Sequence, residues 1–268
     1  IYSEVPATEG LLHDDRHLGV VYERIAVPPR EAPEARRAAI EAARTRHAER
    51  LRRLADAGFV PRDPEDERLL RLWRAHGGTG PLRDAADRVR FQSGMADRFR
   101  AGLERSGNWK PWIETTLAAH GLPRELAVLP HVESSFDPAA RSRVGAAGLW
   151  QFMPATGRSY LRIDADVDER LDPMRATEAA ARYLSAAHAR LGSWPLAIVS
   201  YNHGVNGMAR ARAQLGSDDI VRVIREYRSP TFGFASRNFY PSFLAALRVA
   251  READRRFPGL VRAEPWRT

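Results

Sequence analysis

Residues 131–138 read His-Val-Glu-Ser-Ser-Phe-Asp-Pro. The apolar residues just before this stretch, between 126 and 132, recur with the spacing of a mostly buried helix. We expect that helix to end near Glu133, because a residue that precedes proline, here Asp137, is steered away from helical geometry. The stretch therefore places a carboxyl group at the end of a buried helix, where the chain changes direction.

A second stretch, residues 145–154, reads Gly-Ala-Ala-Gly-Leu-Trp-Gln-Phe-Met-Pro. Its small residues let the backbone approach a neighbour closely, and its aromatic and methionine side chains offer an apolar wall. Gln151 stands in this apolar company and needs a hydrogen-bond partner if it is buried. A carboxyl group beside such a wall is desolvated, which raises its pKa and suits a general acid that works near neutral pH. On these residues alone, an exposed Glu133 at a helix end is the simpler interpretation.

Most of the chain carries the 3.6-residue period of helices. In the first third we expect helices at 34–57 and 65–76, and a third that opens at 79–81, while residues 20–27 alternate only weakly as a short strand. Further along we expect a helix opened by Pro154, helical period from about 94, and helices at 173–191, 195–201, 205–215, 219–227 and 240–257. We find no convincing β-sheet and predict an all-α fold with at most a minor β element in a loop.

The sequence carries a net charge of +8, and Lys110 is its single lysine among many arginines. A basic chain suits a polyanionic partner, either nucleic acid or the carboxylate-bearing cell wall, although solvated charges are the simpler explanation. No zinc-finger, RRM or KH signature accompanies the charge, so we expect no nucleic-acid partner. The chain has no cysteine, which excludes thiol nucleophiles, disulfides and thiolate metal sites.

The sequence shows no segment for targeting or for crossing a membrane. No apolar run approaches the roughly 20 residues that a membrane-spanning helix needs. The chain begins with Ile1 and carries no signal peptide, so we expect a targeting segment to have been removed. A removed N-terminal segment with a lipid anchor, which would associate the protein with a membrane, would leave the same sequence.

Three motifs in order carry a family resemblance: residues 133–138, residues 145–154, and Ser-Tyr-Asn-His-Gly at 200–204. They resemble the signatures of the soluble lytic transglycosylase (SLT) family, which has a goose-type-lysozyme-like fold, and most closely its membrane-bound lytic transglycosylase D type. Each motif alone is a weak signal, but three in order at suitable spacing are specific. The resemblance covers roughly residues 95–250.

The resemblance implies a helical lysozyme-like catalytic domain, which we place at 94–258, with an N-terminal helical appendage at 1–93 and a C-terminal tail at 259–268. It implies cleavage of the β-1,4 bond between N-acetylmuramic acid and N-acetylglucosamine without water, which leaves a 1,6-anhydro end. Glu133 matches the family's single acid/base, while Asp137 fits better as a turn residue. The implied partner is the peptidoglycan glycan strand, in the periplasm or cell envelope, with no cofactor and no metal, and we expect a monomer.

Other family positions carry over one at a time. The residues that match substrate-binding positions are Ser142, Gln151, Tyr201, Asn202 and Tyr240. Tyr201 would lie near Glu133 or the sugar, and Asn202 would position its loop, although structural support of the groove is an alternative for both.

This chain also departs from the family pattern. Ser200 stands where alanine is commoner, and Ala235 stands where many members carry a glutamate. The aromatic position that follows is either Phe239 or Tyr240, and we favour Tyr240 for polar contact with the substrate.

Two other functions remain open on the sequence. A goose-type-lysozyme-like muramidase would hydrolyse the same bond, but it needs a second carboxylate to activate water, and we see no firm candidate. A non-catalytic wall-binding protein would keep the groove and dispense with the glutamate, which is present here.

Two apparent metal signals fail. Asp164, Asp166 and Asp168 imitate the opening of a calcium loop, but the sixth and twelfth positions lack the required glycine and glutamate. A solvated acidic loop is the better interpretation. His131 and His203 invite a zinc site, but no HExxH motif accompanies them.

Overall fold

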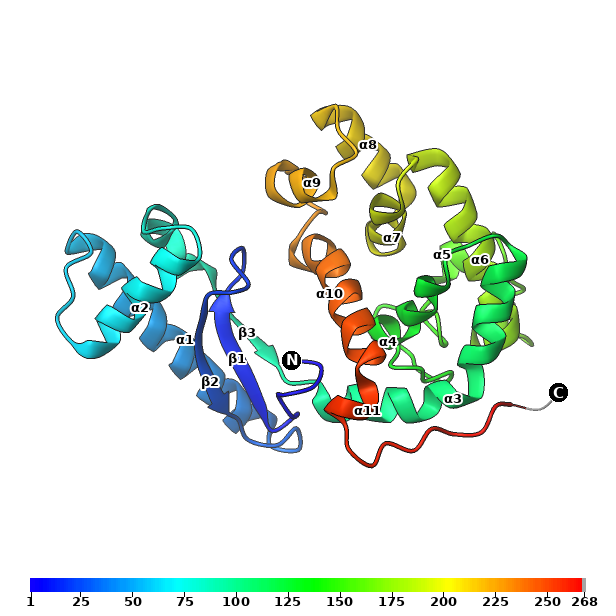
Figure 1. Cartoon of the computed structure of the whole chain (residues 1–268), viewed down its shortest axis with the longest axis horizontal. Helices are drawn as coiled ribbons and strands as arrows, with labels where there is room; N and C mark the ends of the chain where they lie inside the picture. The colour runs from blue at the N-terminus through cyan, green and yellow to red at the C-terminus, as the bar shows by residue number, and fades with distance from the viewer. Residues whose placement is uncertain (267–268) are drawn as a thin grey trace. The chain divides into compact units, whose positions relative to one another are not determined.

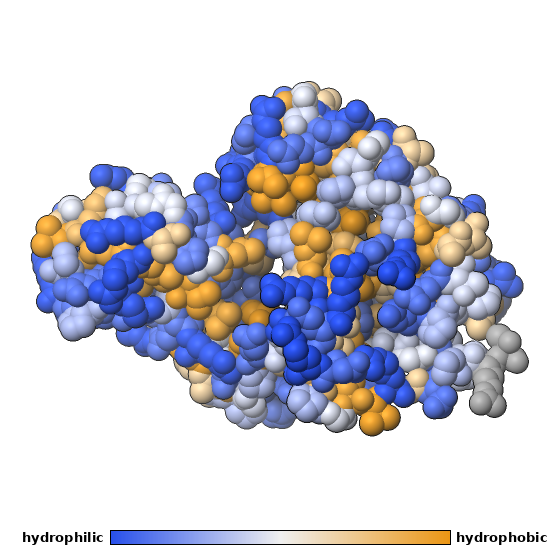
Figure 2. Space-filling model, viewed as in Figure 1, coloured by the Kyte–Doolittle hydropathy of each residue, from blue (hydrophilic) through white to orange (hydrophobic). Residues whose placement is uncertain are grey.

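The structure, a computed structural model, describes residues 1–266. It divides into two compact units, Ile1–Asp97 and Arg98–Thr268, whose elements are labelled in Figure 1. Helices dominate, as predicted. On the face shown in Figure 2, hydrophilic residues cover most of the surface and apolar residues lie in patches among them. No helix among the described residues is both long and apolar enough to cross a membrane.

The first unit contains a three-stranded antiparallel sheet, which corrects our expectation of an N-terminal helical appendage without a convincing β-sheet. Its strands, in the order β2-β1-β3, are β1 (Glu9–Asp14), β2 (Val21–Ala26) and β3 (Val89–Ser93). Only β2 had been considered as a strand. Strand β1 was not predicted because it buries His13 and Asp14 beside Leu12, which removes the alternation of apolar and polar residues. In addition, β3 pairs with β1 from the other end of the unit.

Three helical segments complete the first unit, close to the expected ranges. They are α1 (Pro33–Asp56), α2 (Pro64–Ala75) and the 3-10 segment η1 (Gly80–Arg88). Each has a proline in its first turn, where the missing N–H costs nothing. Helices and sheet share one apolar core, in which Leu12, Leu51 and Trp73 are fully buried.

An ion-pair cluster ties α1 to α2. The Asp66 side chain is completely buried and accepts two hydrogen bonds from Arg53, at 2.7 and 2.8 Å, and one from Arg50 at 2.6 Å. The backbone N–H of Arg62 donates a further bond at 3.0 Å. The hydrogen-bonded Arg53 guanidinium holds the pKa of Asp66 well below its usual range.

The second unit is helical throughout its regular elements. In chain order they are α3 (Ala96–Ala119), η2 (Arg124–Val128), α4 (Leu129–Glu133), α5 (Pro154–Gly157), η3 (Glu169–Leu171), α6 (Pro173–Leu191), α7 (Trp194–His203), α8 (Val205–Leu215), α9 (Ile220–Glu226), α10 (Phe234–Arg251) and α11 (Ala253–Arg256). Helix α7 packs against α6, α8 and α10, and α10 also packs against α4. The apolar α7 is thus the centre of the unit, and α4 reaches it through α10.

Local sequence explains most of these helix ends. For α6, the Asp172 side chain caps the first turn by accepting from two backbone N–H groups, and Gly192 ends the helix in the left-handed conformation. The expected start of α10 at Tyr240 was wrong, since α10 begins six residues earlier in the chain, at Phe234, and contains Pro241.

The chain after α11 is extended and lies along α3. The backbone N–H of Ala263 donates to the carbonyl of Glu104 at 2.8 Å, and that of Trp266 donates to the carbonyl of Asn108 at 3.0 Å. Gly107 allows this approach, because a Cβ there would lie 1.9 Å from the Ala263 oxygen. The rings of Trp109 and Trp266 stack with centroids 5.4 Å apart.

Candidate active site

Glu133 is the last residue of α4 and is only partly exposed. Burial raises the pKa of its carboxyl group to about 8. Among the residues that the structure describes, none forms a hydrogen bond or ion pair with this carboxyl group. Glu133 is therefore protonated at neutral pH and can donate its proton to a bound molecule.

The turn after Glu133 has an uncommon backbone. Ser135 and Phe136 have φ values of 56° and 57°, which residues with a Cβ rarely adopt. Neighbouring groups hold them there: Arg105 in α3 donates to the Ser135 carbonyl at 2.7 and 3.2 Å. Gly102, one turn earlier in α3, leaves room, because a Cβ there would lie 2.9 Å from the same oxygen. The turn is thus fixed from α3, and such strain is common at functional sites.

The rest of the first motif closes the turn through its own hydrogen bonds. The Ser134 hydroxyl donates to the Leu149 carbonyl at 2.8 Å, which links the first motif to the second. The Asp137 carboxylate accepts from the backbone N–H of Ala139 at 3.0 Å, as expected of a turn residue.

The second motif forms a tight loop held from inside. Gly148 has φ 80°, and a Cβ there would lie 1.6 Å from the Arg170 carbonyl oxygen. The Arg170 guanidinium is buried and donates to the carbonyls of Gly145 and Phe152 at 2.8 and 3.0 Å. Asp168 binds the same guanidinium at 2.8 Å, so our interpretation of Asp168 as a solvated loop residue was wrong. The acid neutralises the arginine that shapes the loop.

Gln151 lies in this loop with φ 50°. Its amide nitrogen donates to the carbonyls of Ala140 and Gly148, at 3.1 and 2.8 Å. The partner expected for a glutamine in apolar company is therefore the loop's own backbone. Ser142 acts similarly, since its hydroxyl accepts from the N–H of Ala146 at 2.9 Å.

Tyr201 joins the second and third motifs. Its hydroxyl donates to the Trp150 carbonyl at 2.8 Å. Burial raises the pKa of Tyr201 well above its usual value, and the nearby charge of Glu133 adds to the rise. Trp150 itself lies in the core, fully buried, with its indole N–H bonded to Thr177 at 2.9 Å. Trp150 therefore supports the apolar wall of the second motif from the core side.

Two further aromatic residues, Tyr160 and Tyr183, join this apolar wall, and no motif pointed to them. The Tyr183 ring meets Tyr201 edge-on with centroids 5.3 Å apart, and its hydroxyl donates to the Ser200 carbonyl at 2.8 Å. Tyr160 contacts both Tyr183 and Phe152. These residues come from helices and loops whose proximity only the fold establishes.

Asn202 is exposed at the end of α7 and is held by α10. Its side-chain oxygen accepts from the Ser236 hydroxyl at 2.8 Å, and Ser236 is buried. The sequence comparison had drawn attention to the missing glutamate at Ala235 and passed over Ser236. Tyr240, one turn further along α10, is half-buried and stacks on Phe243 at 6.2 Å.

The predicted residues fall into two groups. Glu133 lies close enough to Tyr201 to influence its pKa, and Asn202 is hydrogen-bonded to α10. Ser142 instead bonds within its own loop, and Tyr240 packs on Phe243 and on an apolar core of the second unit. Within residues 1–266 no group of three or more His, Cys, Asp or Glu side chains is placed to hold a metal ion. His131 is buried between Phe99 and Phe136, and burial lowers its pKa to about 3.

Comparison with known proteins places these motifs in a family. The family described as "Transglycosylase SLT domain" matches residues 110–223. Membrane-bound lytic murein transglycosylase D of Escherichia coli K12 is 35% identical over 131 residues, which are 47% of this chain and 29% of that protein. The chain therefore spans under a third of that relative's length.

A shorter relative matches over more of its own length. Endo-type membrane-bound lytic murein transglycosylase A of Klebsiella pneumoniae MGH 78578 is 31% identical over 140 residues, which are 45% of this chain and 67% of that protein. The solved structure of an inactive mutant of lytic transglycosylase Slt from Pseudomonas aeruginosa covers 79% of this chain and 31% of its own, with 19% identity and a TM-score of 0.38. On the sequence matches, the chain belongs to the SLT-domain family of lytic transglycosylases.

Proposed function

We propose that this protein is a peptidoglycan lytic transglycosylase that cleaves the β-1,4 bond between N-acetylmuramic acid and N-acetylglucosamine and leaves a 1,6-anhydro end. One observation carries the proposal: Glu133, at the position of the family's acid, is a partly exposed carboxyl group that burial keeps protonated at neutral pH. The names of its relatives, which are lytic murein transglycosylases, agree with this substrate.

In the proposed reaction Glu133 acts twice. It first donates its proton to the glycosidic oxygen, so that the bond to the muramyl anomeric carbon breaks and the glucosamine leaves with a free hydroxyl group. The resulting carboxylate then accepts the proton of the muramyl 6-hydroxyl as that oxygen bonds to the anomeric carbon. The proton balance closes on Glu133, and the same burial that makes it a weak acid makes its carboxylate a strong base.

The surroundings of Glu133 favour this route over hydrolysis. A muramidase needs a second carboxylate to activate water or to bind the sugar. Asp137 accepts a hydrogen bond within its own turn, and Asp168 is paired with Arg170. The shift of the Glu133 pKa has burial as its cause, with no contribution from a neighbouring acid.

The remaining roles follow from this reaction. Tyr201 would hold the sugar beside Glu133, and Gln151, Ser142, Asn202 and Tyr240 would shape or line the groove for the glycan strand. We infer that the catalytic domain corresponds to residues 94–258 and acts as a monomer on the cell wall, in the periplasm or at the cell envelope.

Digestion of purified sacculi tests the proposal. We expect anhydro-muropeptides in the digest by mass spectrometry, and a loss of at least about 100-fold in their rate of release by Glu133→Gln. Asp137→Asn is the matched control, because asparagine keeps the turn acceptor and removes the charge, and it should retain activity. Products with reducing ends would instead identify a hydrolase, and an undigested sacculus would leave only wall binding.

A further inference from the structure

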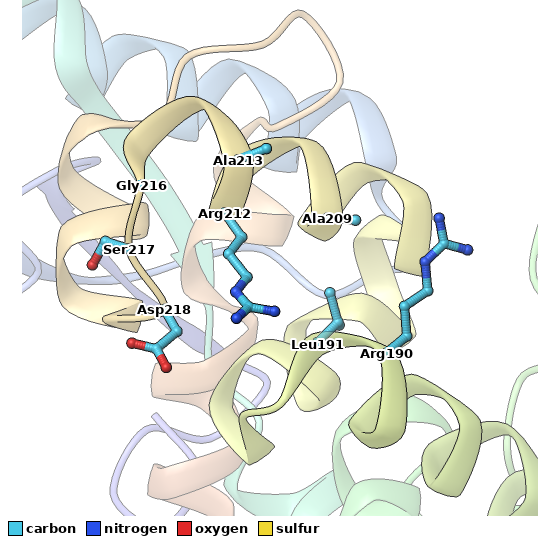
Figure 3. Close-up of a pocket in the computed structure, with 8 residues that line it drawn as sticks. All are labelled: Arg190, Leu191, Ala209, Arg212, Ala213, Gly216, Ser217 and Asp218. Atoms are coloured by element: carbon cyan, nitrogen blue, oxygen red, sulfur yellow. The ribbon is translucent and has the colours of Figure 1, made fainter.

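Arg170 is the one arginine in the described part of the chain that is buried. Arginines elsewhere are at least partly exposed. Arg190 and Arg212, for example, line a hollow where α6 and α8 end, and their guanidiniums point apart at the surface (Figure 3). A guanidinium is costly to remove from water unless its charge and its N–H groups all find partners. The burial of Arg170 therefore calls for a role that surface arginines do not have.

The partners of Arg170 tie two segments of the chain to one rigid group. Its Nε and Nη2 donate to the two carboxylate oxygens of Asp168, each at 2.8 Å. Its Nη1 donates to the carbonyls of Gly145 and Phe152, at 2.8 and 3.0 Å. These carbonyls stand at the two ends of the second-motif loop. The planar guanidinium can serve all three partners at once, whereas the flexible ammonium of a lysine has no such fixed fork.

Asp168 is itself held in place by a short hairpin at residues 162–169. A backbone bridge joins the two sides of the hairpin. At its tip the Asp164 carboxylate accepts from two backbone N–H groups, at 2.9 and 3.0 Å. The other charged group that faces the pair is Arg141, whose exposed side chain lies 3.7 Å from the Asp168 carboxylate. The hairpin thus presents the carboxylate that orients Arg170.

The loop that Arg170 holds carries the wall beside Glu133. The Phe152 ring packs against Tyr201 with centroids 5.9 Å apart. The Tyr201 hydroxyl donates to the Trp150 carbonyl at 2.8 Å. Tyr201 is the titratable group that faces Glu133, since the charge of Glu133 adds to the rise of the Tyr201 pKa. A loop that moved at either end would shift this wall and admit water to the acid.

We propose that Arg170, oriented by Asp168, is a positioning residue for the reaction at Glu133, because it fixes both ends of the second-motif loop and thereby the aromatic wall that shields the acid. That this reaction is a transglycosylation rests on the proposed function. Arg170 lies beneath the loop and acts through it, so its loss should change the surroundings of Glu133 as well as the stability of the fold.

Arg170→Lys tests the proposal, because lysine keeps the positive charge beside Asp168 but cannot bond both loop carbonyls as well. In assays on soluble glycan strands we expect kcat to fall about tenfold or more, with a smaller change in KM. The high-pH limb of kcat/KM, where Glu133 loses its proton, should move to lower pH, since water around a carboxyl group favours its charged form.

A second measurement does not depend on activity. The backbone N–H groups of Ala147, Gly148 and Gln151 form hydrogen bonds within this part of the chain, and their hydrogen exchange should be faster in Arg170→Lys. Arg162→Lys is the matched control. Arg162 pairs with Asp164 in the same hairpin, but both side chains are more than 40% exposed, so rate, pH limb and exchange should stay unchanged.

Asp168→Asn decides the matter if Arg170→Lys does not fold. It keeps the size of the side chain and one acceptor oxygen, and it should produce the same changes to a smaller extent. A lower melting temperature with unchanged kcat, pH limb and loop exchange would overturn the proposal, because Arg170 would then only stabilise the fold. Equal changes in the Arg162→Lys control would overturn it too.

The wild-type digest separates this proposal from the transglycosylase reaction. If the wild type releases no anhydro products, the reaction is wrong, and hydrogen exchange still tests the hold of Arg170 on the loop. If the wild type releases them and the Arg170 and Asp168 variants match its rate and pH limb, only the role of Arg170 is wrong.

Discussion

Asp66 in the first unit is completely buried and Glu133 in the second is partly buried, yet their surroundings shift their pKa values in opposite directions. Asp66 is completely buried and receives hydrogen bonds from Arg50, Arg53 and a backbone N–H, which keep its pKa low. Glu133 has no such partner, and burial alone raises its pKa to about 8. The neighbours of a buried acid therefore decide whether it stabilises the fold or remains available for chemistry.

The backbone shows the same contrast between the units. Of the four described residues other than glycine with positive φ, Ser135, Phe136 and Gln151 lie in the motifs around Glu133, and only Phe59 lies in the first unit. The second unit thus stores backbone strain beside its unpaired acid. The first unit uses its polar groups to join its helices.

Removal of the cations around Asp66 should destabilise the protein more than any other change considered below. Replacing both Arg50 and Arg53 by glutamine leaves a buried carboxylate without a cation, and we expect the unit to lose about 3–5 kcal/mol in free energy of unfolding. The loss should shrink below about pH 4, because the stability contributed by an acid of lowered pKa disappears as that acid is protonated. Chemical denaturation at pH 7 and pH 3 measures both.

Arg52→Gln is the matched control for that double variant. Arg52 also lies on α1 and pairs with Asp87, but both side chains are more than half exposed. We expect a change below about 1 kcal/mol. Equal losses in the two proteins would mean that the buried position of Asp66 is unimportant.

The strained turn at Ser135 and Phe136 should depend on its hydrogen bonds from Arg105. Arg105→Met removes both hydrogen bonds to the Ser135 carbonyl and keeps most of the side-chain volume. We expect a loss of about 2 kcal/mol in stability and roughly a tenfold lower rate of sacculus digestion, because Glu133 loses its fixed position. Arg98→Met, at an exposed position on the same helix, should change neither. A lower stability with an unchanged rate would limit Arg105 to a structural role.

The burial of Glu133 should lower the free energy of unfolding at high pH, where its carboxyl group would ionise in water. Its pKa is about 8 in the folded chain and near 4.5 when exposed, so the folded state keeps a proton that the unfolded state releases between these values. The wild-type protein should therefore lose stability as pH rises from about 5 to 8. Glu133→Gln, which has no charge to bury, should be clearly more stable than the wild type at pH 8 and nearly equal to it at pH 5. Parallel stability curves would refute the raised pKa.

Local sequence signals correctly predicted those parts of the fold that depend on residues adjacent in the sequence. Helix α6 has its predicted bounds, because Asp172, Pro173 and Gly192 each act on adjacent backbone groups. The end of α4 at Glu133 followed from Asp137-Pro138 in the same way. The sheet was missed because its central pairing joins strands from opposite ends of the unit.

The candidate site shows the same limit. The motifs identified Glu133, Tyr201 and Asn202 through a family resemblance. No sequence pattern indicated that Arg105 would meet the Ser135 carbonyl, since that contact depends on how α3 packs beside the turn. The sequence therefore predicted interactions between residues near in the chain, but not contacts between residues that only the fold brings together.

Ser236 holds Asn202 as the arginines hold Asp66, but through a single neutral hydrogen bond of 2.8 Å, so its loss should matter less than the changes above. Ser236→Ala frees the Asn202 amide to rotate, and we expect KM for glycan strands to rise about threefold to tenfold with kcat little changed, in line with a loss of roughly 1 kcal/mol. Ser236→Thr keeps the hydroxyl and should restore KM. If threonine fails to rescue, or if kcat falls instead, the bond to Asn202 does not position the substrate. The third motif would then serve only to pack α7 against α10, and Glu133 would remain the residue on which the proposed activity depends.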